Sequence, residues 1–203
     1  MGSTVAAACY AVVLGTAVLG VGRVDDRRRR PPLATCCALL VIGTMSLLQL
    51  TAFPALLAAL QRDPTGLAHG QLWRLGTSLT VQDGGWPGTV FNLTILAVVG
   101  VTAESLWSRP RWWLIALTAG IGAQFWGLVV QPSGAGNSVL VFGLAASLHV
   151  LALRYGAKPS RVLAVLGLGT AVALLVGRDV HGGAALIGAV VSAVLLRRGG
   201  AAS

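Results

Sequence analysis

Two residues with complementary chemistry begin separate apolar segments in the second half of the chain. Ser138 follows Gly136 and Asn137, and His181 lies 43 residues further on, where the last apolar run begins. A serine hydroxyl becomes a nucleophile when a neighbouring imidazole takes its proton, so this pair has the composition of a catalytic dyad. Polar groups are costly in hydrocarbon, which favours a functional interpretation of both residues.

The composition is that of an integral membrane protein. Hydrophobic residues make up 55% of the 203 residues, charged residues make up 10%, and the mean hydropathy is +0.79. A helix needs ~20 apolar residues to cross the hydrocarbon, and regular alternation of apolar and polar residues is absent. We therefore expect an all-α polytopic membrane protein and not a β-barrel. The expected membrane helices cover residues 1–22, 33–60, 89–107, 112–131, 138–153, 162–177 and 182–196.

The basic residues predict the orientation of these helices. Residues 1–22 have no basic segment before the apolar run, so we interpret them as a retained first helix and not as a cleaved signal. With the N-terminus outside and the C-terminus in the cytoplasm, twelve Lys and Arg residues fall inside and three outside, a clear positive-inside bias. The inside set is Arg23, Arg27 to Arg30, Arg109, Arg111, Arg154, Lys158, Arg161, Arg197 and Arg198.

This asymmetry accounts for the net charge of +9, so we expect no nucleic-acid partner. Arg27 to Arg30 are suited to contact anionic membrane lipid. Because no organelle-targeting segment precedes the first helix, the expected location is the plasma membrane.

The remaining polar residues exclude several kinds of intramembrane chemistry. The six acidic residues fall in loops or at segment ends, so the paired carboxylates of an aspartyl protease are missing. The His-Glu-x-x-His signature of zinc proteases is absent, and the cysteines lie in apolar segments, so neither a metal nor a cofactor is expected. A transporter is disfavoured because neither midplane ionisable residues nor inverted repeats are found.

The residues around Ser138 and His181 indicate how the two side chains would meet. A helix that starts at Ser138 would direct free N–H groups at developing negative charge. Phe142 lies one turn later on the same face, where it would pack beside the imidazole or in the core. Small residues allow close helix approach, and a stripe of them follows the histidine at helical spacing: His181, Ala184, Ala185 and Gly188.

In their order along the chain, these motifs resemble the rhomboid family of intramembrane serine proteases. Residues 136–144 are similar to the family's Gly-x-Ser nucleophile segment, and Trp73-Arg74 to its Trp-Arg loop motif. Residues 84–92 are similar to the entry of its second core helix, and residues 100–104 to the Gly-x-x-x-Glu that closes it. The resemblance covers about residues 70–190.

The resemblance implies a domain organisation. A rhomboid-like six-helix core would occupy residues 33–203, preceded by an extra N-terminal transmembrane helix and a basic cytoplasmic loop over residues 1–32. Glu104 and Arg74 would brace loops and take no part in chemistry.

The resemblance also implies roles for individual residues. Ser138 would attack a peptide carbonyl while His181 takes its proton, and Asn92 with the Ser138 backbone N–H would bind the oxyanion. Gly136 and Phe142 would support this pair. The expected function is cleavage of transmembrane or membrane-proximal segments of other membrane proteins.

Three departures from the family pattern keep an alternative open. Gly88 stands where the family often has an oxyanion-binding histidine, Val139 replaces a common glycine, and Gln82 stands where a loop histidine is frequent. Loss of one oxyanion donor costs ~10²- to 10³-fold in turnover. The alternative is a weak or inactive rhomboid-like protein that binds transmembrane clients, and a small transporter is a third possibility.

Overall fold

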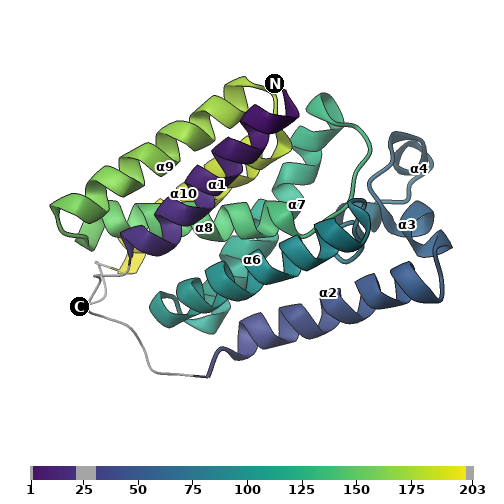
Figure 1. Cartoon of the computed structure of the whole chain (residues 1–203), viewed down its shortest axis with the longest axis horizontal. Coiled ribbons are helices and arrows are strands. Elements are labelled where there is room, and N and C mark those ends of the chain that lie inside the picture. Colours follow the sequence, from purple (N-terminus) through teal and green to yellow (C-terminus); the bar gives the residue numbers. More distant parts are fainter. Residues whose placement is uncertain (1, 22–30, 200–203) are drawn as a thin grey trace.

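A computed structural model of the chain describes residues 2–21 and 31–199 as a bundle of helices (Figure 1). The helices of this described part are α1 (Ser3–Gly20), α2 (Leu33–Thr51), α3 (Ala55–Leu60), α4 (Pro64–Ala68), α5 (Arg74–Thr77), α6 (Gly85–Leu106), α7 (Arg109–Val130), α8 (Ser138–Tyr155), α9 (Lys158–Val176) and α10 (Val180–Gly199). Seven of them, all except α3 to α5, are long and apolar enough to span a membrane. The prediction of an all-α polytopic membrane protein is confirmed. Arg23 and Arg27 to Arg30 lie outside the described residues.

Prolines explain where the helix boundaries differ from expectation. The single helix expected over residues 33–60 is wrong, because α2 ends at Thr51 and a separate α3 begins at Ala55. Pro54 disfavours helical backbone at the preceding residue and clashes with the carbonyl four positions earlier. Elsewhere prolines lie inside helix starts, because a first-turn residue needs no N–H partner. For this reason α6, α7 and α9 begin earlier than expected, with Pro87, Pro110 and Pro159 near their first residues.

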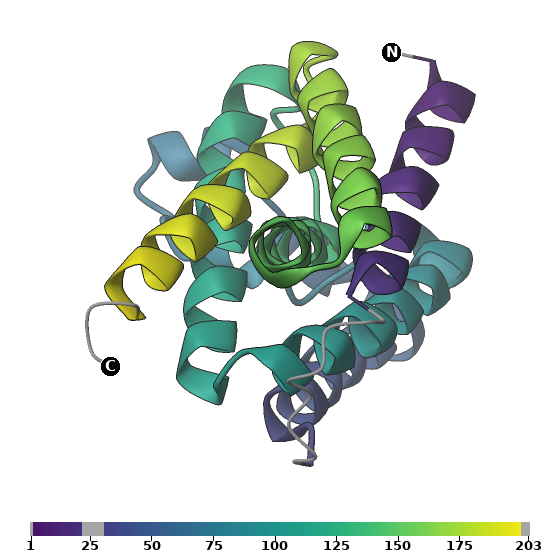
Figure 2. The same cartoon turned by 90° about the vertical axis from the view of Figure 1, so that its left-hand side faces the viewer.

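Helix α8 forms the centre of the bundle. Figure 2 shows α8 end-on, surrounded by α1, α6, α7, α9 and α10. Its residues from Val139 to His149 are all buried. Helices α7, α9 and α10 pack against it, while α1 packs along α9 and α8, and α2 packs on α6. On the outer helices, large apolar side chains such as Leu40 and Val176 are exposed, which suits a surface in contact with lipid tails.

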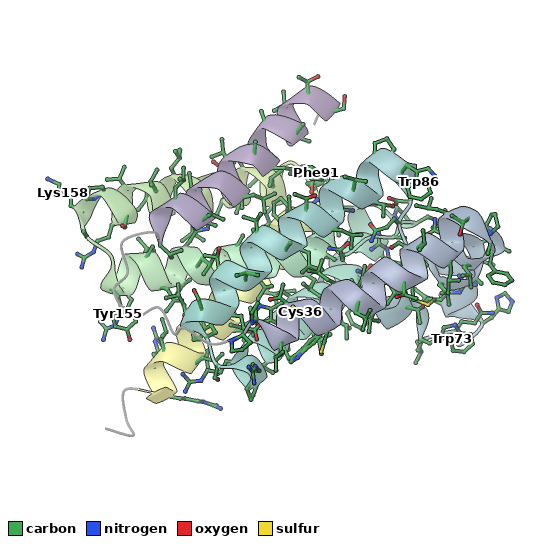
Figure 3. The ribbon with its side chains drawn as sticks, turned by 60° about the horizontal axis from the view of Figure 1, so that its bottom comes forward. Cys36, Trp73, Trp86, Phe91, Tyr155 and Lys158 are labelled. Carbon is green, nitrogen blue, oxygen red and sulfur yellow. The ribbon has the colours of Figure 1, made fainter. Side chains whose placement is uncertain are left out.

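The two ends of the bundle carry different features. Trp73 and Trp86 lie at the end that holds α3 to α5, whereas Tyr155 and Lys158 lie at the opposite end (Figure 3). Helices α8 and α10 both begin at the end with α3 to α5. Ser138 and His181, which stand at these helix starts, are therefore placed at the same end of the molecule.

Glu104 and Arg74 brace connecting segments, as predicted. The Glu104 carboxylate accepts hydrogen bonds from the backbone N–H groups of Ala34 and Thr35 and so caps the start of α2. The Arg74 guanidinium donates to the carbonyl of Ala58, which ties α5 to α3. Both side chains serve the architecture at a distance from the pair formed by α8 and α10.

Candidate active site

The fold brings Ser138 and His181 into direct contact. The Ser138 hydroxyl lies 2.9 Å from Nε2 of the imidazole, within hydrogen-bonding range. The other ring nitrogen, Nδ1, lies 2.8 Å from a carboxylate oxygen of Asp179. Because a carboxylate only accepts hydrogen bonds, Nδ1 carries the proton and Nε2 is left to accept from Ser138. This tautomer is the one in which an imidazole acts as a base toward a serine.

Close packing of glycines explains how the two helix starts meet. A Cβ atom added at Gly188 of α10 would lie 2.3 Å from the carbonyl oxygen of Gly143 on α8. The backbones therefore touch at this crossing, which lies within about two helical turns of Ser138 on α8 and of His181 on α10. Ala184 is fully buried, and its carbonyl oxygen lies 3.7 Å from a Cβ atom built at Gly143. Ala184 and Gly188 of the predicted small-residue stripe thus face α8, the helix that carries Ser138, whereas Ala185 lines a cavity with residues of α9.

Asp179 also belongs to the site. In the sequence analysis it was placed with the other acidic residues in loops and given no role. One carboxylate oxygen, Oδ1, accepts hydrogen bonds from both the Nδ1–H and the backbone N–H of His181. The second oxygen, Oδ2, accepts a bond of 2.6 Å from the Tyr10 hydroxyl. Burial raises the pKa of Asp179, but the hydrogen bonds and charge of His181 and the bond from Tyr10 outweigh it, so the net pKa is lowered. Asp179 is therefore held as a carboxylate.

Two aromatic rings enclose the imidazole. The Phe142 ring centroid lies 4.6 Å from that of His181, and the Tyr10 ring centroid lies 4.5 Å from it. Phe142 is fully buried on α8 and also meets Tyr10 edge-on. The sequence allowed Phe142 to pack beside the imidazole or in the core, and in the structure its ring lies beside the imidazole. Together the rings leave His181 little freedom to rotate away from Ser138.

A cavity of about 100 Å³ lies beside the serine. Its lining residues are Arg62, Asp83, Asn92, Gln124, Gln131, Gly134, Ala135, Gly136, Ser138, Val139, Val180 and His181. Asn92 of α6 and Ser138 of α8 thus face one space, although they come from different helices. The cavity therefore lies directly beside the Ser138 hydroxyl and the His181 imidazole.

The amide of Asn92 is oriented by a chain of polar side chains. Its Nδ2 donates to Oε1 of Gln82 at 2.7 Å, and Nε2 of Gln82 donates to Oδ1 of Asn137 at 2.8 Å. Gln82 is almost fully buried and is pinned further by two bonds between its backbone and the Gln49 amide. An Nδ2 group has two hydrogens, and the bond to Gln82 uses one of them. The other is free to donate into the cavity.

Gly136 leaves open a space between Asn92 and Ser138. Its φ of +142° favours glycine, and its N–H donates to the carbonyl of Ser78. A Cβ atom at this position would lie 3.4 Å from Nδ2 of Asn92 and 3.8 Å from Oγ of Ser138. A side chain here would therefore fill the gap between the amide donor and the nucleophile.

The departures from the family pattern have distinct structural settings. Among the described residues, no atom lies within 4 Å of a Cβ built at Gly88, so this position is open. Val139 is buried and lines the cavity wall. Gln82 takes the place of the loop histidine and supports Asn92 instead.

Arg62 lines the cavity and holds the loop before Ser138. Its backbone pairs with Gly134 in both directions, and its guanidinium donates to Gln124 and to the carbonyl of Pro132. Burial lowers the pKa of Arg62, and the nearby Asp83 carboxylate partly opposes this effect. Arg62 therefore fixes the loop that presents Gly136.

Tyr10, Asp179, Gln82 and Arg62 are the members of this site to which sequence reasoning gave no role in it. For Asp179 a signal existed, because it lies two residues before His181 at a helix start. For Tyr10 the signal was weak: it is one of only two tyrosines and lies in an apolar run 169 positions before Asp179, its hydrogen-bond partner at the site.

The comparison with known families agrees with the geometry. The chain matches no curated protein and no solved structure. A family model described as the Rhomboid domain matches residues 69–198, which include α5 to α9 and all but the last residue of α10. This range contains Asn92, Ser138 and His181, and it covers well over half of the chain. The protein with this partly buried serine–histidine contact at one end of a seven-span bundle belongs to the rhomboid family.

Proposed function

We propose that this protein is an intramembrane serine endopeptidase that cleaves transmembrane or membrane-proximal segments of other membrane proteins. The observation that carries the proposal is the 2.9 Å hydrogen bond between Ser138 Oγ and His181 Nε2, with Nδ1 held by a carboxylate. A nucleophile, a base and a group that orients the base form the arrangement by which serine hydrolases work. Family membership supports the same reaction class.

In the proposed first step, Ser138 Oγ forms a bond to the carbonyl carbon of the scissile peptide as its proton passes to His181 Nε2. The carbonyl oxygen becomes an oxyanion. The imidazolium then gives its proton to the leaving amine, the C–N bond breaks, and an acyl-enzyme remains on Ser138. Water attacks the ester with His181 as base, releases the carboxylate product and restores the serine.

The oxyanion would be bound by two donors in this account. The backbone N–H of Ser138 is at the start of α8, where N–H groups have no partner inside the helix. The second donor is the free hydrogen of Asn92 Nδ2, next to the space above Gly136. The partial positive charge of the helix start adds to their effect.

The substrates and the orientation follow from the position of the site. Ser138 begins a helix of 18 residues at the centre of the bundle, so a peptide must enter the bundle end to reach it. We propose membrane-protein substrates, a plasma-membrane location and a site on the outer side. Lys and Arg residues at the opposite helix ends, such as Arg109, Arg154 and Arg197, support this orientation.

A second candidate function is client binding without cleavage, and the open position at Gly88 favours it. In that case a histidine at this position would not restore turnover. For a protease that merely lacks one oxyanion donor, Gly88→His should raise the cleavage rate, because the new side chain has free space next to α6.

Cleavage by the purified protein in liposomes tests the proposal. A panel of tagged single-span substrates is incubated with the wild type and with Ser138→Ala and His181→Ala. We expect cleavage by the wild type that both variants lose. Co-purification of a span with wild type and Ser138→Ala alike, with no product from either, would replace the protease by the client-binding function.

A further inference from the structure

Helix α1 reaches the candidate active site although the family match begins at residue 69. It packs along α9 and α8 and also contacts α6. Figure 1 shows it crossing the bundle beside α9, with its first residues at the end where α8 and α10 begin. This course brings Tyr10, in the third turn of α1, next to His181.

Tyr10 contacts the site through two different features of its side chain. Its hydroxyl donates to Oδ2 of Asp179 at 2.6 Å, a length typical of a bond to a charged acceptor. Its ring lies 4.5 Å from the imidazole, centroid to centroid, at a tilt of 57°. The hydroxyl thus holds the carboxylate while the ring covers the base that this carboxylate orients.

We propose that Tyr10 is a positioning residue of the active site, which acts through Asp179, so that α1 completes a hydrogen-bonded chain of Tyr10, Asp179, His181 and Ser138. This inference rests on the proposed protease function. Its new content is that the helix outside the matched domain supplies part of the catalytic apparatus.

The two carboxylate oxygens of Asp179 accept hydrogen bonds from different residues, which supports the proposal. Oδ1 already accepts two hydrogen bonds from His181. Oδ2 has the Tyr10 hydroxyl as its side-chain donor, and this bond fixes the rotation of the carboxylate about its Cβ–Cγ bond. A carboxylate free to rotate would hold Oδ1 in line with Nδ1 less well, and the imidazole would lose its fixed direction toward Ser138.

The backbone around Asp179 is built to keep the carboxylate in place. Arg178 has a φ of +59°, which is uncommon for a residue other than glycine. The Asp179 N–H donates to the carbonyl of Leu174, and its carbonyl accepts from Nε1 of Trp126. The Arg178 conformation and the two backbone hydrogen bonds of Asp179 therefore fix the turn between α9 and α10. Tyr10 adds a hydrogen bond to the Asp179 side chain.

Two isosteric variants separate positioning from packing. Tyr10→Phe keeps the ring and removes the hydroxyl, so the remaining carboxylate is less satisfied and more basic. It then stabilises the imidazolium more, and the acid limb of the pH–rate profile moves to higher pH. Asp179→Asn removes the negative charge and destabilises the imidazolium, so the acid limb moves to lower pH. Charged groups across the cavity or in the same turn, Arg62, Asp83 and Arg178, are unchanged in both variants.

We expect Tyr10→Phe to lower kcat by about 10-fold at little change in KM, since a hydrogen bond to a charged group contributes about that factor. Asp179→Asn should cost about 10²-fold or more. Tyr155→Phe is the matched control: it changes the only other tyrosine, 59% exposed at the far end of the bundle. Thr16→Val is a second control on α1, because it removes the hydrogen bond between Thr16 and His149 without reaching the site. Neither control should move the pH profile.

Two readouts keep the inference and the proposed function separable. If wild type cleaves and Tyr10→Phe has the same kcat and pH profile, the inference is wrong and the protease proposal stands. If wild type does not cleave, the low-field proton resonance of the His181 Nδ1–H still decides the inference. A shift of this resonance in Tyr10→Phe but not in Tyr155→Phe supports it, and an unchanged resonance overturns it.

Discussion

The crossing of α8 and α10 at Gly143 and Gly188 controls the distance between Ser138 and His181, and Gly188→Ala should break it. The added Cβ would lie 2.3 Å from the Gly143 carbonyl oxygen and 2.6 Å from its Cα. Both neighbours are backbone atoms, which cannot rotate away. We therefore expect the two helices to separate at the crossing.

The size of this separation follows from van der Waals contact. Cβ contacts shorter than 3.4 Å are tight, so the helices must part by about 1 Å. The bond between Ser138 Oγ and His181 Nε2 is 2.9 Å long, and an added ~1 Å takes it beyond hydrogen-bonding range. A misplacement of this size costs ~10²-fold in rate, and overpacking costs ~1–3 kcal/mol in stability.

Gly169→Ala provides the matched control. Gly169 lies on α9, and no described atom lies within 4 Å of a Cβ built there. The same substitution should leave activity unchanged and slightly stabilise the helix, by ~1 kcal/mol. Cleavage rates in liposomes and thermal unfolding in micelles are measured for both. Equal cleavage rates in Gly188→Ala and Gly169→Ala, with both proteins folded, would refute the claim that this crossing sets the geometry of the pair.

Three further outcomes are expected. Gly136→Ala should lower turnover by ~10²-fold at unchanged substrate binding, because its Cβ would fill the space beside Asn92 Nδ2 and its φ of +142° becomes strained; steady-state kinetics of cleavage measure it. Asn92→Ala should lower the cleavage rate by ~10²-fold, and unchanged turnover at equal protein level would remove Asn92 from the oxyanion site. The lowered pKa of Asp179 predicts a stabilising contribution that is present above its ordinary value of 3.8 and lost as pH falls through the lowered value. Denaturation of wild type and Asp179→Asn from pH 7 downward should therefore give stabilities that converge in acid.

The sequence identified the parts of the fold that depend on local pattern. Apolar runs of sufficient length predicted seven spans, and the order of the Gly-x-Ser segment and the later histidine predicted which two helices meet. Helix boundaries were less accurate where prolines occur, because Pro54 breaks a helix whereas Pro87 is accommodated in a first turn. The pattern alone does not distinguish these two uses of proline.

The contribution of α1 lay beyond the reach of the sequence for a physical reason. The bond between Tyr10 and Asp179 joins residues 169 positions apart, and α1 has neither a charged residue nor a family motif to indicate its partner. Only the packing of α1 against α9 and α8 determines that Tyr10 meets the turn before His181. Gln82 is similar, because its role depends on Asn92 of α6 and on Asn137, the residue before α8, which both reach it.

Covalent labelling of Ser138 tests whether this serine is a nucleophile activated by His181. The folded protein in micelles is treated with a fluorophosphonate probe, and the modified peptide is located by mass spectrometry. We predict modification of Ser138 that is lost in Ser138→Ala and strongly slowed in His181→Ala, while the buried Ser147 remains unmodified. A folded wild type in which Ser138 remains unlabelled, or is labelled equally fast in His181→Ala, would contradict the account.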